Sequence, residues 1–183
     1  MSVRFCLALC LSNPEQTKIM LVESQDNLSE FVVPCFSKRA TEYTMPYDYR
    51  VFPEQNFVIA RFFGTFTAND GVDWARDYFA HADFAPDQLQ LFDWQNIAEF
   101  DATYTSVARL VRAISGDYAR LSAGTLCVMH APQDVSFGMA RMYQQVADDV
   151  LPTQIEVARS EEEALGIAGL DAQSFEEILP LAS

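Results

Sequence analysis

The chain has 183 residues, of which half are hydrophobic and 13% are aromatic, so it can bury one ordinary core and is not globally disordered. Its formal net charge of −14 repels phosphate backbones and anionic lipid headgroups, and we therefore expect no nucleic-acid binding and no attachment to a membrane surface. No apolar run reaches the roughly 18 residues that a membrane span needs, which favours a soluble, cytoplasmic protein.

The first 44 residues differ in character from the rest of the chain. They carry three short apolar runs, VRFCLALCLS, KIMLVES and EFVVPCF, separated by polar, turn-forming stretches. The first run is short for a signal peptide, and no A-x-A-like cleavage site follows it. We therefore predict an N-terminal extension at residues 1–44, either short strands or a loosely attached segment, and a domain at residues 45–183.

From Tyr49 onward, strands and helices alternate along the chain. FVIARFF is apolar on both alternating sets except at Arg61, which is typical of a strand covered on both faces. Ser160 followed by Glu163 predicts a capping box. The predicted order is β-β-α-β-α-β-α-β-α, with strands at residues 49–53, 56–64, 87–94, 124–131 and 153–159 and helices within residues 67–79, 103–116, 134–150 and 160–165. This order predicts an α/β fold with a mainly parallel sheet and helices packed against it.

Two side chains stand out as candidate contacts for an anion or another ligand. His130 ends a central strand, where open α/β sheets carry their ligand crevices. Arg61 lies in the middle of a buried strand and needs an acidic partner or a route to the surface. No G-x-S-x-G elbow and no glycine-rich phosphate loop occur in the sequence. We therefore predict no enzyme and no cofactor; catalysis would require an acid or base within reach of His130.

The four cysteines predict neither a disulfide framework nor a metal site. Cys6 and Cys10 are four residues apart, but no second close pair and no nearby histidine follow them. Cys35 and Cys127 lie in apolar runs, where a buried free thiol is the usual case. No zinc and no other metal is therefore expected.

The stretch LFDWQNIAEFDATYTSVARLV, residues 91–111, predicts the end of a strand, a loop and the start of a helix. Asp93 and Asp101 fall in the predicted loop, and Thr103 and Ser106 fall in the first helical turn. Asp101 is expected to cap the helix. A phosphate on Thr103 would lie near the free N–H groups of that turn, so a regulatory switch is the second interpretation. These four residues form the candidate switch or interaction site.

Several stretches of the chain resemble the STAS domain. ARFFGTFT has a glycine closing the second strand, LQLFDW has an aspartate closing the third, and SFGMARMYQQVADD and IEVARSEEEAL are similar to the last two helices of stand-alone members. With the order of elements, they resemble most closely the bacterial SpoIIAA-like group, which includes STAS/SEC14-like proteins. The resemblance covers roughly residues 47–170 and implies a SpoIIAA-like STAS fold for the domain.

The resemblance also implies a function. The best-understood members are anti-anti-sigma factors, which bind an anti-sigma kinase and are switched by phosphorylation in a D-S-[ST]-G-like motif at the start of the second helix. In EFDATYTSV, Asp101 and Thr103 match that motif, whereas Tyr104 replaces its second hydroxyl and its glycine is absent. This implies a non-enzymatic bacterial regulatory module. It would bind a protein partner, or itself, around the second helix and the loops flanking Asp93.

The alternative is a carrier or sensor of a small apolar or lipid-like ligand, because other STAS/SEC14-like proteins are thought to hold such molecules. It predicts an apolar cavity between the sheet and the second and third helices. The aromatic side chains available to line it are Phe62, Phe63, Phe66, Phe92, Trp94 and Phe100.

Overall fold

The computed structural model of the protein describes residues 46–178. The predicted extension at residues 1–44, with Cys6, Cys10 and Cys35, lies outside the described residues. The elements, in chain order, are β1 (Tyr47–Phe52), β2 (Phe57–Thr67), α1 (Ala68–Phe79), β3 (Leu89–Asp101), α2 (Tyr104–Tyr118), β4 (Leu126–His130), α3 (Asp134–Ala147), β5 (Gln154–Ala158), α4 (Glu161–Ala168) and α5 (Phe175–Ile178). The predicted α/β class is confirmed, and α5 is a short helix that the sequence patterns did not indicate.

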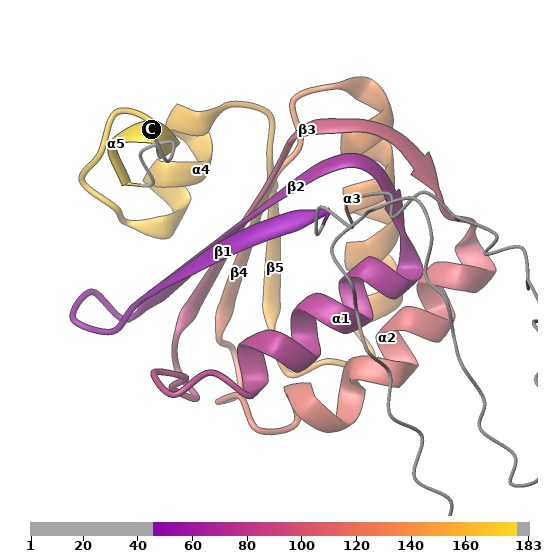
Figure 1. The fold of residues 1–183 in the computed structure, drawn as a ribbon, viewed down its shortest axis with the longest axis horizontal. Helices are drawn as coiled ribbons and strands as arrows, with labels where there is room; N and C mark the ends of the chain where they lie inside the picture. The colour runs from indigo at the N-terminus through magenta and orange to yellow at the C-terminus, as the bar shows by residue number, and fades with distance from the viewer. Residues whose placement is uncertain (1–45, 179–183) are drawn as a thin grey trace, which may run out of the picture. The chain divides into compact units, whose positions relative to one another are not determined.

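The five strands form one sheet in the order β1-β2-β3-β4-β5. β1 and β2 form the predicted antiparallel hairpin, with Phe52 opposite Phe57, and all other neighbouring strands are parallel. Parallel neighbours need crossover connections, and right-handed crossovers between strands added in one direction fall on one side of the sheet. Helices α1, α2 and α3 therefore cover one face, while α4 and α5 follow the last strand and cover part of the other (Figure 1).

The strands β2 and β3 are longer than predicted. The sequence places their ends at Gly64 and Trp94, but parallel pairing continues as far as Thr67 opposite Asp101. Gly64 has a φ of 66° and lies beside a register irregularity, so it bends the strand and does not end it. The predicted loop at residues 95–101 is wrong, because pairing with β2 provides backbone hydrogen bonds that the local sequence does not reveal.

The helix starts follow local capping chemistry. Thr67 caps α1, and its backbone N–H donates to Asp70 Oδ2 at 2.6 Å. Ser160 caps α4 as predicted, and its hydroxyl accepts from the N–H of Glu163. The predicted capping box is incomplete there, because the Glu163 carboxylate accepts from the N–H of Arg159, one residue before the cap. The position of the α4 cap was thus predicted correctly, whereas the hydrogen bond of Glu163 with Arg159 was not.

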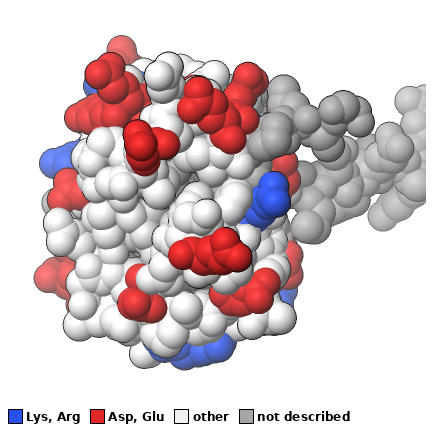
Figure 2. Space-filling view, turned by 90° about the vertical axis from the view of Figure 1, so that its left-hand side faces the viewer, with Lys and Arg blue, Asp and Glu red and all other residues white. Residues whose placement is uncertain are grey.

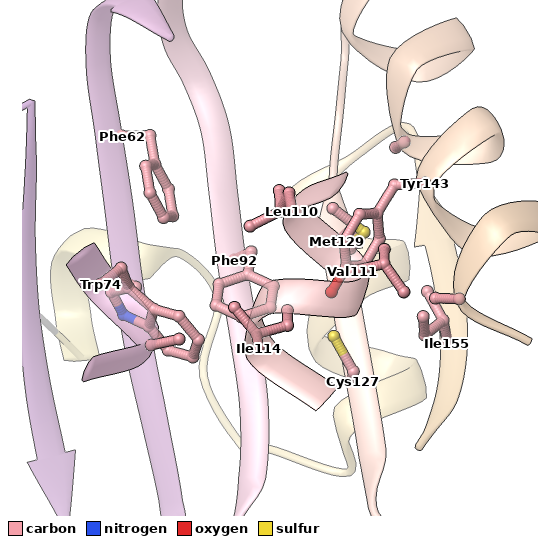
Figure 3. Packing of buried hydrophobic residues seen from close by; sticks show 14 of the residues in the cluster. Phe62, Trp74, Phe92, Leu110, Val111, Ile114, Cys127, Met129, Tyr143 and Ile155 are labelled. Carbon is pink, nitrogen blue, oxygen red and sulfur yellow. The ribbon is translucent and has the colours of Figure 1, made fainter. Parts of the chain in front are cut away.

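Each face of the sheet has its own hydrophobic core, because alternate residues of a strand point to opposite sides. On the face covered by α1, α2 and α3, which we call the α1–α3 face, aromatic rings dominate. Trp74 of α1 meets Phe92 of β3 edge to face, with ring centroids 4.6 Å apart (Figure 3). On the opposite α4–α5 face, Leu91 of β3 packs in a smaller cluster with Leu165 of α4 and Phe175 of α5.

Cys127 is buried in the core of the α1–α3 face, as its apolar run predicted, and burial raises the pKa of its thiol well above the usual range. Among residues 46–178, no helix combines the length and the apolar character that crossing a membrane requires.

Candidate functional site

Charged residues on four neighbouring strands lie opposite one another. The register pairs Asp48 of β1 with Arg61 of β2, and Arg61 with Asp93 of β3. Asp93 is in turn opposite His130 of β4. Arg61 alternates in step with the buried Ile59, so its side chain lies on the α4–α5 face of the sheet. The sequence indicated Arg61, Asp93 and His130 for separate reasons, and the fold brings the three together.

Arg61, Asp93 and His130 form a buried charge network. The atoms His130 Nδ1 and Asp93 Oδ1 are 2.9 Å apart, and Arg61 Nε lies 3.9 Å from Asp93 Oδ2. The side chains are buried, with exposed fractions of 5%, 5% and 2% for Arg61, Asp93 and His130. The Asp93 carboxylate therefore balances the guanidinium. Of the two alternatives expected for Arg61, an acidic partner or a route to the surface, the structure shows the first.

The surroundings of the network differ at its two ends. At the inner end, the ring of Phe175 in α5 meets the His130 ring edge to face, with centroids 5.1 Å apart. At the outer end, Asp48 lies on the edge strand β1 and is exposed. Partial burial raises the pKa of the Asp48 carboxyl; the charge of Arg61 opposes this rise and the charge of Asp93 adds to it.

The pair of Asp93 and His130 has the geometry in which a carboxylate orients an imidazole. It thus supplies the acid within reach of His130 that an enzyme would need. Access is the obstacle, because His130 is 98% buried and its ring lies against Phe175. The network joins β2, β3 and β4, and its three buried side chains are not accessible to a substrate in this structure.

The predicted switch segment has a different geometry from the one expected. Thr103 is the N-cap of α2, and its Oγ1 accepts from the N–H of Ser106 at 3.3 Å. In return, Ser106 Oγ accepts from the N–H of Thr103 at 2.7 Å. The expectation that Asp101 caps the helix is wrong, because β3 extends through Asp101 and the cap falls two residues later.

The four candidate switch residues do not form one site. Asp93 lies within β3, buried on the α4–α5 face, and not beside a loop as expected. Thr103 and Ser106 begin α2, which packs on the opposite face, and Asp101 is exposed at the end of β3. The structure therefore separates Asp93 from the other three residues.

An apolar cavity of about 40 Å³ lies between the sheet and the helices of the α1–α3 face, several of whose lining residues are labelled in Figure 3. Of the aromatic side chains named from the sequence, four line it, whereas Phe63 and Phe100 do not. Trp74 also lines the cavity; sequence reasoning missed it because its helical spacing reads as ordinary core. The lining residues are Phe62, Phe66, Gly71, Trp74, Phe92, Trp94, Val107, Leu110, Ile114, Tyr118, Met129, Met139 and Tyr143.

No protein-family model matches the chain. No curated protein sequence matches it either. The function is therefore inferred from the geometry of the described residues and from the sequence resemblance.

Proposed function

We propose that the protein is a non-enzymatic regulatory module of the STAS type that acts by binding a protein partner or a second copy of itself. The observation that carries this proposal is the start of α2, where Tyr104 has 64% of its surface exposed. Its neighbours Thr103 and Thr105 are exposed as well. A large exposed aromatic side chain is a residue type that protein interfaces favour, and Tyr is enriched among their hot spots.

The acidic surface of the protein indicates what charge the surface of a partner should carry. Figure 2 shows acidic side chains spread over the side of the molecule that bears α4, α5 and the β1–β2 turn, with few basic ones between them. The first turn of α4 alone carries Glu161, Glu162 and Glu163. With a formal net charge of −14, the chain attracts partners with basic surfaces and repels acidic ones.

In this proposal, Thr103 and Ser106 supply the regulation. They exchange hydrogen bonds across the first turn of α2, the turn that carries Tyr104. A phosphate on Thr103 would replace this cap and add negative charge near Asp101, so it would rearrange the surface around Tyr104. Binding and modification are thereby coupled through one helical turn.

The experiment uses site-specific photo-crosslinking in the native host. A photo-reactive amino acid in place of Tyr104 is expected to form a covalent adduct with the partner, or with a second copy of the chain. The matched control is Val135, which lies in the first turn of α3 and has 67% of its surface exposed. The same photo-reactive amino acid at position 135 should form no such adduct. No adduct at position 104, or equal adducts at both positions, would contradict the proposal.

The same crosslink tests the switch. Thr103→Glu is expected to reduce the adduct at position 104 several-fold, because the added charge replaces the hydroxyl cap. Thr105→Glu is the control, since Thr105 is exposed and takes no part in the capping bonds between Thr103 and Ser106. Equal effects of the two substitutions would contradict the proposed switch at Thr103 and leave the binding surface at Tyr104 untouched.

A second function, a carrier or sensor of a small apolar ligand, is supported by the cavity on the α1–α3 face. Its volume of about 40 Å³ is far below the roughly 300 Å³ or more of typical ligand pockets, so a lipid chain would require the helices to separate. Native mass spectrometry of protein purified from its own host would detect a lipid-sized ligand. Consistent absence of bound mass would contradict a lipid carrier and leave room for very small molecules alone.

A further inference from the structure

The only two tryptophans of the chain line the same cavity. Trp74 comes from α1 and Trp94 from β3, and their exposed fractions are 2% and 6%. The indole Nε1 atom of each is buried and has no hydrogen-bond partner within residues 46–178. Buried indole N–H groups usually find an acceptor, so two without one beside a single cavity call for a physical reason.

The other lining residues determine which kind of ligand the cavity can bind. The lining consists of aromatic side chains, including the tyrosines Tyr118 and Tyr143, with aliphatic side chains, two methionines and one glycine, and it contains no charged residue. The Tyr118 hydroxyl is engaged, since it donates to Gln90 Oε1 at 3.2 Å. A charged ligand would lose its hydration without gaining a counter-charge, so the cavity selects a neutral molecule.

The unpaired groups of the lining are donors. An indole N–H donates and cannot accept, so the complementary ligand brings a hydrogen-bond acceptor. A carbonyl oxygen accepts without adding an O–H that would itself need a partner, whereas an alcohol or a water molecule brings such a group into an apolar space. Carbonyl compounds therefore match the lining better than alcohols do.

The size of the cavity limits the ligand. A buried water molecule occupies about 10–15 Å³. A cavity of about 40 Å³ therefore admits only a molecule of a few non-hydrogen atoms, on the order of three or four. Leu110 and Met139 also line the space and have flexible ends that can adjust to a ligand of slightly different shape.

We propose that this cavity is a binding site for a small neutral carbonyl compound of about three or four non-hydrogen atoms. Its oxygen accepts a hydrogen bond from the indole N–H of Trp74 or Trp94, and its apolar part packs between rings such as Phe92. The site lies in the core of the α1–α3 face and is independent of the partner surface at Tyr104. It also gives the second proposed function a specific ligand class.

The test uses nuclear magnetic resonance on the full chain labelled with nitrogen-15, in which the two tryptophans give two indole N–H signals. Titration with acetone is expected to shift at least one signal downfield and to saturate in the millimolar range, since a ligand of four non-hydrogen atoms binds weakly. Isobutene has the same skeleton with a CH₂ group in place of the oxygen. It is expected to produce no downfield shift, because it offers no acceptor.

A variant with a smaller cavity tests whether the indole shift arises from acetone bound in the cavity. Val107→Ile adds one methylene to the lining and is expected to weaken the acetone response at least tenfold, while both indole signals remain visible. Trp94→Phe removes one donor and is expected to weaken binding by roughly five- to tenfold if that indole is the donor used.

Three results would overturn the proposal: no saturable indole shift with acetone, equal downfield shifts with isobutene, or an unchanged response in Val107→Ile. Each of them would assign the unpaired indole groups to bound water or to solvent effects. None of them bears on crosslinking at Tyr104, so failure of this site and failure of the partner surface remain distinguishable.

Discussion

The two faces of the sheet treat their buried polar groups differently. On the α4–α5 face, Arg61, Asp93 and His130 lie opposite one another, so charges that cannot reach water compensate each other. On the α1–α3 face, the buried indole groups of Trp74 and Trp94 are neutral and lack acceptors. The charges of Arg61 and Asp93 offset each other although Arg61 Nε forms no hydrogen bond within residues 46–178, whereas the residues with unpaired indole donors line a cavity that a small molecule can fill. The comparison therefore assigns strand register to the first face and ligand binding to the second.

The largest expected effect comes from breaking the charge network. Asp93→Ala leaves the guanidinium of Arg61 buried without its counter-charge, and we expect a loss of about 3–5 kcal/mol in the free energy of unfolding, measured with urea. The control is the double variant Arg61→Met with Asp93→Leu, which removes both charges and should recover most of that loss. A cost below about 1 kcal/mol for Asp93→Ala would show that the face does not depend on compensation.

The α1–α3 face should instead respond to alkaline pH. Burial raises the pKa values of Tyr78, Tyr118 and Tyr143 above their ordinary value of about 10. Above pH 10 the unfolded chain loses phenol protons that the folded chain keeps, so stability present below pH 10 falls as the pH rises. Each phenol contributes about 1.4 kcal/mol per pH unit, measurable from urea unfolding between pH 9.5 and 11.

A substitution in this phenol set provides the check. Tyr143→Phe keeps the ring and removes the ionisable hydroxyl, so above pH 10 the slope of stability against pH should fall by about 1.4 kcal/mol per pH unit, the contribution of one phenol. Absorbance at 295 nm gives the independent measurement. Ionisation of every tyrosine near pH 10 in the folded protein would contradict the expected protection of the phenols in this core.

The smallest expected change in stability comes from substitutions that test how much free space the α1–α3 face has. A Cβ at Gly71 of α1 would lie 2.9 Å from Leu110 Cδ2, whereas a Cβ at Gly138 of α3 has no atom within 4 Å. Both changes to alanine gain the same helix propensity. Because only the Gly71 change creates a close contact with Leu110, we expect Gly71→Ala to be less stable than Gly138→Ala by about 1–2 kcal/mol. Pushing Leu110 toward the cavity should also weaken the acetone response. Equal stabilities of the two variants would mean that the helices α1 and α2 have room to separate.

Local patterns explain which parts of the fold could be predicted. Thr67 and Ser160 were identifiable as helix caps because the groups that they bind are three residues away in the chain. The assignment of the α2 cap to Asp101 was wrong because Thr103 can cap a helix equally well. Only pairing with β2 shows that β3 continues to Asp101. Trp74 remained hidden because a helical stripe of apolar residues does not reveal a cavity behind it.

Patterns along the chain were enough to predict the α/β class, the burial of FVIARFF on both faces and, for Arg61, an acidic partner or a route to the surface, because each depends on residues close together in the chain. The fold was needed to identify Asp93 as the partner of Arg61 and to place His130 next to Asp93. Asp93 and His130 are 37 residues apart, and the register of parallel strands brings them to 2.9 Å. Register depends on the packing of distant side chains on both faces of the sheet, and no local pattern contains that information.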